Sequence, residues 1–273
     1  MQSVKIKIFK AFIFLLPMVW SVSLYGQQFK LIAKIDTVAK IATVDNLGNL
    51  FLVTPQNEIL KFDGKGKFLW NYTNNSYGEL TQIDVTDPLR VILYYPAYQQ
   101  VVVLNNNLGE ISKYNFNRNP ELQIPLIASA NNNGFWIYDQ INRELSKLTN
   151  NFLDDLKTGN IYQRNGFDMQ ANYMLTDDQQ VYVNDVGTGV RIFDQYGNFL
   201  KTAVVYPQET FNVDGDEIYF TDKNKLMSYN YFTFVLKKIT LPQKTDFKKV
   251  VLRFNRLIIL REKDLTLWSI KKD

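Results

Sequence analysis

Short apolar segments alternate with tight polar turns along most of this chain. In six places an apolar segment, a turn centred on Asp or Asn, and a second segment rich in aromatic or β-branched residues follow one another. Such pairs are typical of β-strands joined as hairpins. They occupy residues 41–53, 82–94, 126–138, 173–183, 210–220 and 250–260. The pattern therefore returns about every 40 residues, which is the spacing of β-propeller blades.

Each unit continues with two further strand-like segments. An apolar segment follows the second strand, as in 59–62 and 190–194, and a Gly-containing turn then leads to a fourth strand. The stretches 62–69 and 193–200 repeat nearly the same phrase, with Phe-Asp, a turn containing Gly, and Phe-Leu. Asp, Asn and Gly supply the side-chain hydrogen bonds and positive φ angles that hairpin turns require. We therefore predict that each unit is a four-stranded antiparallel blade.

The two ends of the chain complement each other. The last unit, 249–271, contains only three predicted strands, whereas one unpaired strand, 28–35, stands at the N-terminal end. If this strand joins the last unit, the ring closes and the exposed edges of an open array disappear. We therefore predict an all-β fold, a six-bladed β-propeller closed by the N-terminal strand, as a single domain over residues 27–273. A sandwich or a single barrel explains six evenly spaced units less well.

A few segments have a local pattern of their own. Residues 150–157 are predicted to form one or two helical turns in a loop, which places Asp154 and Asp155 in a solvated connection between the third and fourth units. The acidic residues at 177–178 and 214–217 fall at expected hairpin turns. We interpret them as turn residues rather than as a cation site.

Residues 41–69 and 174–200 resemble blades of the NHL-type six-bladed propellers. In that family a strand ending in Val-Asp leads through a Gly-Asn turn to an apolar strand and an Asp, and then to an Arg-apolar-x-Phe-Asp segment. The Asp after the second strand is present as Asp139, Asp185 and Asp222, whereas Thr54 replaces it in the first unit. The match is fair in the second and fifth units and poor in the third and last. The resemblance implies a fold rather than an activity, because propellers include lyases, lactonases and binding modules.

The N-terminus has the organisation of a secretory signal peptide over residues 1–26. Lys5, Lys7 and Lys10 precede an uncharged apolar stretch, 11–24, which is short for a membrane span of about 20 residues. We expect cleavage after Gly26, and an uncleaved signal anchor is the alternative. The mature protein is then periplasmic, associated with the outer membrane or extracellular, and it is not expected to be an integral membrane protein.

Export changes the interpretation of the charge. The formal charge of +4 comes from 31 basic and 27 acidic residues, and the three lysines before residue 11 account for most of it. The remaining basicity is concentrated in residues 237–273, with eleven Lys and Arg against four acidic residues. An exported, nearly neutral chain is not expected to bind nucleic acid. The basic segment is either a solvated outer face or a patch for an acidic partner or anionic head groups.

The chain contains neither histidine nor cysteine. This excludes disulfides, zinc sites of the Cys/His type, cysteine nucleophiles and any Ser–His or Cys–His mechanism. Acid–base chemistry would fall to Asp, Glu, Lys or Tyr, and a metal would need oxygen ligands. We expect no cofactor, and no residue is singled out as catalytic or metal-binding.

Two groups of residues are candidates for binding. The tyrosines flank a proline and an asparagine in predicted loops, where they are less easily buried than aromatics within strands: Tyr95, Tyr98, Tyr229 and Tyr231. The basic candidates lie in the C-terminal part of the chain: Lys237, Lys238, Lys248, Lys249 and Arg256. For the tyrosines, packing between blades is the preferred interpretation, and a binding patch is the alternative.

These features predict an exported, non-enzymatic propeller that acts as a scaffold for protein–protein interaction in a bacterial-type envelope assembly or secretion complex. Two alternatives stay open. One is an enzyme of the lactonase or lyase type that uses a divalent cation, and the other is a propeller that binds carbohydrate or another small ligand. The side chains of the central channel distinguish them, because converging carboxylates favour the enzyme and a plugged or apolar channel favours the scaffold.

Overall fold

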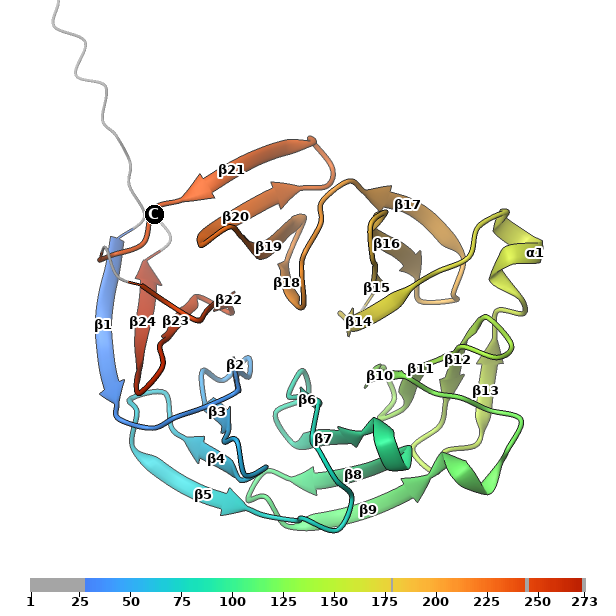
Figure 1. The fold of residues 1–273 in the computed structure, drawn as a ribbon, viewed down its shortest axis with the longest axis horizontal. Coiled ribbons are helices and arrows are strands. Elements are labelled where there is room, and N and C mark those ends of the chain that lie inside the picture. The colour runs from blue at the N-terminus through green and yellow to red at the C-terminus, as the bar shows by residue number, and fades with distance from the viewer. Residues whose placement is uncertain (1–27, 178, 244–245, 272–273) are drawn as a thin grey trace, which may run out of the picture.

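Six four-stranded antiparallel sheets stand around a central axis in the computed structural model (Figure 1). The structure describes residues 28–177, 179–243 and 246–271, and the predicted signal peptide lies outside these ranges. In five sheets the strand order follows the chain from the axis to the rim, and the sixth sheet joins strands from both ends of the chain. The predicted all-β, six-bladed propeller is therefore confirmed.

The first three blades follow the chain from the innermost to the outermost strand. Blade 1 comprises β2 (Ile41–Val44), β3 (Leu50–Val53), β4 (Ile59–Phe62) and β5 (Phe68–Tyr72). Blade 2 comprises β6 (Gln82–Asp84), β7 (Arg90–Tyr95), β8 (Gln100–Asn105) and β9 (Glu110–Asn115). Blade 3 comprises β10 (Leu126–Ser129), β11 (Phe135–Asp139), β12 (Glu144–Leu148) and β13 (Asp154–Lys157).

The next two blades have the same order. Blade 4 comprises β14 (Ala171–Thr176), β15 (Gln180–Asp185), β16 (Gly189–Asp194) and β17 (Phe199–Ala203). Blade 5 comprises β18 (Phe211–Asp214), β19 (Glu217–Asp222), β20 (Lys225–Asn230) and β21 (Val235–Ile239). Helical structure is limited to η1 (Pro96–Tyr98), η2 (Phe116–Arg118) and α1 (Ile161–Asn165) in the described residues. None of these helices is long and apolar enough to cross a membrane.

Blade 6 closes the ring with strands from both ends of the chain. It comprises β22 (Lys249–Arg253), β23 (Arg256–Leu260), β24 (Leu265–Lys271) and, outermost, β1 (Gln28–Ile35). β1 pairs antiparallel with β24, so that Phe29 lies opposite Ile270 and Ile35 opposite Leu265. Figure 1 shows the blue N-terminal strand beside the red C-terminal one. The predicted closure is confirmed.

Side chains of Asp and Asn build the hairpin turns that the repeat predicted. The Oδ1 atom of Asp63 accepts hydrogen bonds from the backbone N–H groups of Lys65 and Lys67, both at 2.9 Å. Asp194 does the same for Tyr196 and Asn198, at 2.9 and 2.8 Å. The shared turn geometry explains why the two stretches have nearly the same sequence.

The core lies between the blades. Buried apolar side chains form six clusters, one at each junction of neighbouring blades. At the junction of blades 6 and 1, for example, Ile35 of the N-terminal strand packs with Leu50, Ile258 and Leu267. Every blade therefore depends on both neighbours for the burial of its two faces.

Residues 150–157 do not form the predicted helical turns. They contain the end of a hairpin turn, in which Phe152 N–H donates to the carbonyl of Thr149 at 3.0 Å, and then β13. Asp154 and Asp155 therefore lie on the outermost strand of blade 3 and not in a connection between blades. Pairing with β12 decides this conformation, because it satisfies a row of backbone groups that a single helical turn would leave free.

Candidate functional site

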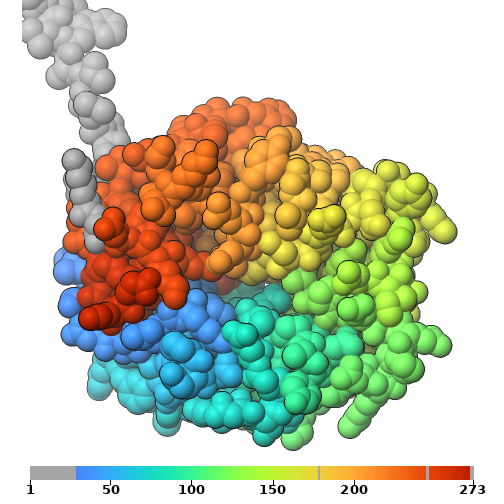
Figure 2. Space-filling model, viewed as in Figure 1, coloured from blue at the N-terminus to red at the C-terminus, as the bar shows by residue number. Residues whose placement is uncertain are grey.

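A cavity of about 420 Å³ opens at the centre of the ring, on the face where the innermost strands begin. Side chains fill most of the space that the ribbon leaves open at the axis, and the hollow that remains is visible in Figure 2. We call this cavity the channel-mouth pocket. Its lining includes residues from all six blades: Thr43, Gln82, Leu126, Tyr173, Asn212 and Val251.

Two long side chains tie the blades together across the axis. The Gln82 amide donates to the backbone carbonyls of Ile127 and Met174, which belong to blades 3 and 4. Arg253 of blade 6 donates to Thr86 Oγ1 at 2.7 Å and to Thr43 Oγ1 at 3.5 Å, in blades 2 and 1. The channel is therefore bridged by the Gln82 amide and the Arg253 guanidinium, each of which is bonded to two other blades.

Lys249, the first residue of β22, reaches into the pocket from the blade 6 side. Its ammonium group lies 3.4 Å from the Glu209 carboxylate, its single side-chain partner among the described residues. The lysine side chain is 19% exposed, whereas that of Glu209 is 79% exposed. Burial lowers the pKa of Lys249, and the nearby Glu209 carboxylate opposes that shift. The pocket thus holds a mostly desolvated cation with a solvent-exposed counter-ion.

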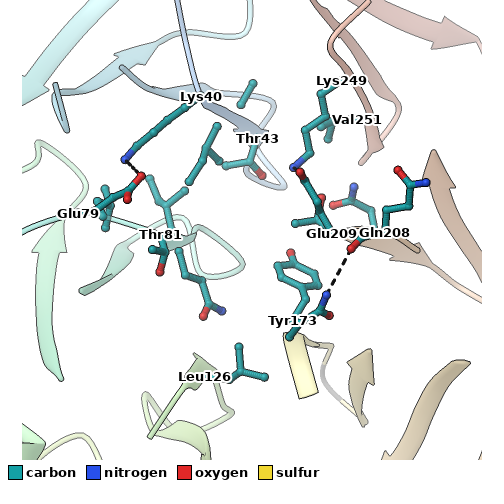
Figure 3. A pocket seen from close by; sticks show the side chains of 18 of the residues that line it. Lys40, Thr43, Glu79, Thr81, Leu126, Tyr173, Gln208, Glu209, Lys249 and Val251 are labelled. Carbon is teal, nitrogen blue, oxygen red and sulfur yellow. Dashed lines mark hydrogen bonds and ion pairs between the residues drawn. The ribbon is translucent and has the colours of Figure 1, made fainter. Parts of the chain in front are cut away.

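Lys40 occupies the opposite side of the mouth and is held more firmly. Its ammonium group donates to Asn57 Oδ1 at 2.8 Å and lies 3.1 Å from the Glu79 carboxylate. Figure 3 shows Lys40 pointing away from the axis toward Glu79, while Lys249 and Glu209 lie on the other side of the pocket. The two lysines therefore differ in availability although each is paired with a glutamate.

Tyr173, on β14, lines the same pocket from the blade 4 side (Figure 3). Its ring packs edge-on against Phe211 at a centroid distance of 5.3 Å. Burial raises the pKa of Tyr173 to about 12, with Arg253 and Asp84 as its charged neighbours, so its hydroxyl is protonated at neutral pH. In the described part of the chain no group forms a hydrogen bond with this hydroxyl. It is therefore a free donor in the pocket.

The pocket has the mixed polar and apolar lining of a small-ligand site. Within the described residues, no group of three or more Asp, Glu, His or Cys side chains is placed to hold a metal ion. The two glutamates at the mouth belong to separate ion pairs on opposite sides. Ammonium, phenol, amide and hydroxyl groups next to apolar Leu126 and Val251 are the lining expected for a small polar ligand.

A second candidate surface is the hairpin between β20 and β21, residues 231–236, which we call the blade 5 hairpin. Phe232 and Phe234 are 71% and 69% exposed, and Val235 and Leu236 are also exposed. The hairpin lies at the far end of the blade from the pocket, because Asn230 pairs with Glu217, which in turn pairs with Asp214 at the end of β18.

The backbone of the blade 5 hairpin has an unusual combination of conformation and exposure. All five hairpins between third and fourth strands place one residue in the left-handed region: Gly66, Leu108, Phe152, Gly197 and Phe234. Leu108 and Phe152 are buried between blades, whereas Phe234, at φ 61°, is exposed. Phe234 is thus strained without the burial that its counterparts obtain.

Three of the four candidate tyrosines are buried, which agrees with packing between blades and leaves only Tyr98 of this group available for binding. Tyr95 ends β7 and packs edge-on against Tyr77 between blades 1 and 2, at 5.6 Å. Tyr229 and Tyr231 pack between blades 4 and 5, where the hydroxyl of Tyr231 lies 3.3 Å from that of Tyr182. The strands extend up to Pro96 and Asn230, so these rings face the core. Tyr98 is half exposed and lies in η1 on blade 2, apart from the other three tyrosines.

The basic candidates do not form one face. Lys237 and Lys238 are exposed on β21, the outermost strand of blade 5, next to the blade 5 hairpin. Lys248 and Lys249 lie at the opposite face of the propeller, at the start of β22, where Lys249 lines the channel-mouth pocket. Arg256 begins β23, and its guanidinium packs near Gly48 of blade 1. The ring distributes a contiguous basic segment over separate surfaces.

The sequence pattern does not single out Glu209, Tyr173 or the pairing of Lys40 with Glu79. Each of these residues stands at or just before the start of an innermost strand, which is a fixed place in the repeat. An alignment of the six units would have shown that these positions meet at the axis. The residue types Glu, Tyr and Lys do not by themselves indicate a position at the axis.

Comparisons with known proteins agree with the fold. No family profile matches the chain, and no curated protein matches its sequence. BamB from Moraxella catarrhalis is 12% identical, with a TM-score of 0.50 over 86% of this chain and 85% of that one. A catalytically inactive histidine-to-alanine variant of virginiamycin B lyase from Staphylococcus aureus, with quinupristin, is 11% identical, with a TM-score of 0.58 over 90% and 99%. A protein of unknown function from Bacteroides thetaiotaomicron is 9% identical, with a TM-score of 0.60 over 90% and 76%. These similarities support the propeller fold, while the NHL type stays a prediction.

Proposed function

We propose that the chain is an exported, non-enzymatic propeller that binds a protein partner in a cell-envelope assembly, and that the blade 5 hairpin is its contact surface. The basic and apolar N-terminal segment of the sequence supports export. The exposed apolar residues of the hairpin and the lysines that follow them support protein binding. A rigid ring that presents such a surface has the general form of a scaffold.

The observation that carries this proposal is the exposed, left-handed Phe234. A left-handed backbone costs a non-glycine residue about 1–2 kcal/mol, which is why glycine takes this place in blades 1 and 4. Phe152 offsets that cost by burying its ring between Tyr114 and Phe135. Nothing in the described part of the isolated propeller buries the phenyl group of Phe234 in the same way. A partner that covers this phenyl group would offset the cost of the left-handed backbone.

The chemistry of the surface indicates what kind of segment it binds. Val235 and Leu236 extend the apolar surface along β21, and Lys237 and Lys238 continue it without a side-chain partner in the part of the chain that the structure describes. β21 is outermost in its sheet, so no other described strand pairs with its outer backbone edge. These features fit an extended segment of the partner in which apolar residues are followed by Asp or Glu.

The enzyme alternative has less support. The similar virginiamycin B lyase is catalytically inactive once a histidine is replaced by alanine, and this chain contains no histidine. Gln82 and Arg253 cross the channel with their polar atoms engaged by neighbouring blades.

Site-specific photo-crosslinking tests the proposal. A photoreactive amino acid replaces Phe232 in the full-length chain, expressed in cells of its source organism, and cross-linked envelope proteins are identified by mass spectrometry. We expect one defined partner. The matched control places the same amino acid at Ile111, an exposed apolar residue on the outermost strand of blade 2.

Charge reversal supplies the second half of the test. The double substitution Lys237→Glu and Lys238→Glu should abolish the cross-link from position 232 with the melting temperature unchanged, because both side chains are exposed. Equal cross-linking from positions 111 and 232, or none from position 232, would contradict the proposal.

A further inference from the structure

We propose that the channel-mouth pocket binds a small hydroxylated organic acid, with its carboxylate held by Lys249 and a hydroxyl held by Tyr173. This inference does not depend on the proposed protein-binding surface, because the blade 5 hairpin lies at the opposite end of the blades. It rests on the contacts of Lys249, on the free hydroxyl of Tyr173 and on the exposure of Glu209.

Lys249 is the residue that selects an anion. A cation that is mostly removed from water needs a close counter-charge, since desolvation of an ammonium group is costly. Its only side-chain partner in the described residues is Glu209, at the long distance of 3.4 Å, and no backbone carbonyl or hydroxyl assists. A ligand carboxylate at ordinary hydrogen-bond distance from the ammonium group would stabilise it more than Glu209 does at 3.4 Å.

Tyr173 supplies a second hydrogen bond to the ligand. Its protonated hydroxyl belongs to the same pocket, has no hydrogen-bond partner among the described residues, and has Arg253 and Asp84 as its charged neighbours. A ligand hydroxyl can accept from such a donor. The ammonium on blade 6 and the phenol on blade 4 therefore offer the acid one donor each, the ammonium to its carboxylate and the phenol to one of its hydroxyls.

Glu209 acts as an internal competitor for this place. Its side chain is 79% exposed, so it can turn into bulk water at little cost when a ligand carboxylate takes its position beside Lys249. Lys40 offers no equivalent opportunity, because Asn57 and Glu79 both hold its ammonium group away from the axis. The pocket is therefore asymmetric, with one available lysine.

The rest of the pocket limits the size and type of the acid. A volume of about 420 Å³ suits a ligand no larger than a sugar acid. Thr43, Gln208 and Asn212 line it with groups that donate to and accept from hydroxyls, while Leu126 and Val251 provide apolar contact. A hydroxylated carboxylate matches both features.

Calorimetric titration of the purified full-length protein with sodium D-glucuronate tests the proposal, with neutral D-glucose as the matched ligand. We expect glucuronate to bind and glucose not to bind. Lys249→Met should weaken glucuronate at least about tenfold, because it removes a hydrogen bond to the carboxylate, and Tyr173→Phe about threefold, because it removes a hydrogen bond to a neutral hydroxyl. Glu209→Gln should tighten binding about threefold by removing the competitor.

Lys40→Met is the control for the general positive charge of the mouth and should change the affinity by less than about twofold. Melting temperatures verify that each variant is folded. Absence of glucuronate binding at about 10 mM, equal binding of glucose, or equal losses for Lys249→Met and Lys40→Met would overturn the proposal. Trialanine is titrated as well, and Lys249-dependent binding of its terminal carboxylate in place of glucuronate would assign the site to a peptide end and overturn the small-acid proposal.

Discussion

At the scale of single residues, the same backbone conformation has opposite meanings at Phe152 and Phe234. Both are left-handed, with φ angles of 60° and 61°. The Phe152 ring stacks on Phe135 and Tyr114 at centroid distances of 4.3 and 4.6 Å, and packing therefore stabilises the strained residue. The Phe234 ring is exposed. Strain that packing does not offset is a reason to infer function at Phe234 but not at Phe152.

Replacing each phenylalanine by glycine should separate these roles. Phe234→Gly should leave the free energy of unfolding within about 1 kcal/mol of the parent, because relief of strain balances the flexibility of glycine. Phe152→Gly should lower it by about 2–4 kcal/mol through loss of a buried ring. Urea denaturation of the two variants provides the measurement. Equal losses would show that Phe234 has a structural role we have not identified.

At the scale of elements, a close contact between a turn and a strand joins the two ends of the ring. A Cβ atom at Gly66, in the turn between β4 and β5, would overlap the Cβ of Ala33 on β1. The first blade therefore fits directly against the strand that closes the last one. Gly187 has a similar φ angle, 78° against 84°, but a Cβ there would meet no atom within 4 Å. The two glycines differ only in their surroundings.

This pair allows a test of how tightly β1 is seated. Gly187→Ala should cost about 1 kcal/mol from its backbone conformation alone. Gly66→Ala should cost about 1–3 kcal/mol more, because β1 must shift. The double variant with Ala33→Gly should recover that excess, and a double-mutant cycle by thermal or urea unfolding measures it. Equal costs at the two glycines would mean that β1 moves freely against blade 1.

At the scale of the whole molecule, the six junctions between blades bury many tyrosine hydroxyls. Burial raises the pKa of Tyr95, Tyr138, Tyr173 and Tyr219 to about 12. The pKa of Tyr182 rises as well, chiefly by burial and further through its hydrogen bond to Tyr231. The ring thereby couples the protonation of these tyrosines to folding.

Alkaline pH should consequently unfold the protein. Unfolded tyrosines ionise near pH 10, so between pH 10 and about 12 the unfolded chain releases protons that the folded chain retains. The stabilising contribution is complete below pH 10 and is lost as the pH rises toward 12. Lys61 and Lys249, whose pKa values burial lowers, act in the opposite sense but are fewer. Circular dichroism and tyrosinate absorbance should change together. Full ionisation near pH 10 with the strands intact would contradict the coupling.

Much of the fold could be predicted from the chain because its determinants are local. Asp63, Asp194 and Gly66 set turn geometry through nearby backbone groups, and apolar alternation sets which strand faces are buried. The failures concern positions that local pattern does not decide. Asp154 lies on a strand because β12 pairs with that segment, and Tyr95 is buried because β7 extends to it.

The candidate site could not be predicted from the sequence for a related reason. Lys249, Glu209 and Tyr173 come from three different blades and meet only because the ring brings the starts of the innermost strands to one axis. The pair Lys237 and Lys238 is only about ten residues from the pair Lys248 and Lys249 in the sequence. The two pairs nevertheless lie on different parts of the propeller.

By itself, the amino-acid sequence determined the number of blades, the turns and the closure by the N-terminal strand, since these depend on neighbouring residues and on a regular repeat. Only the tertiary structure decided which charged and aromatic side chains are exposed, paired or brought together at the axis. Burial and long-range pairing depend on how six sheets pack around a common centre, and no single unit carries that information.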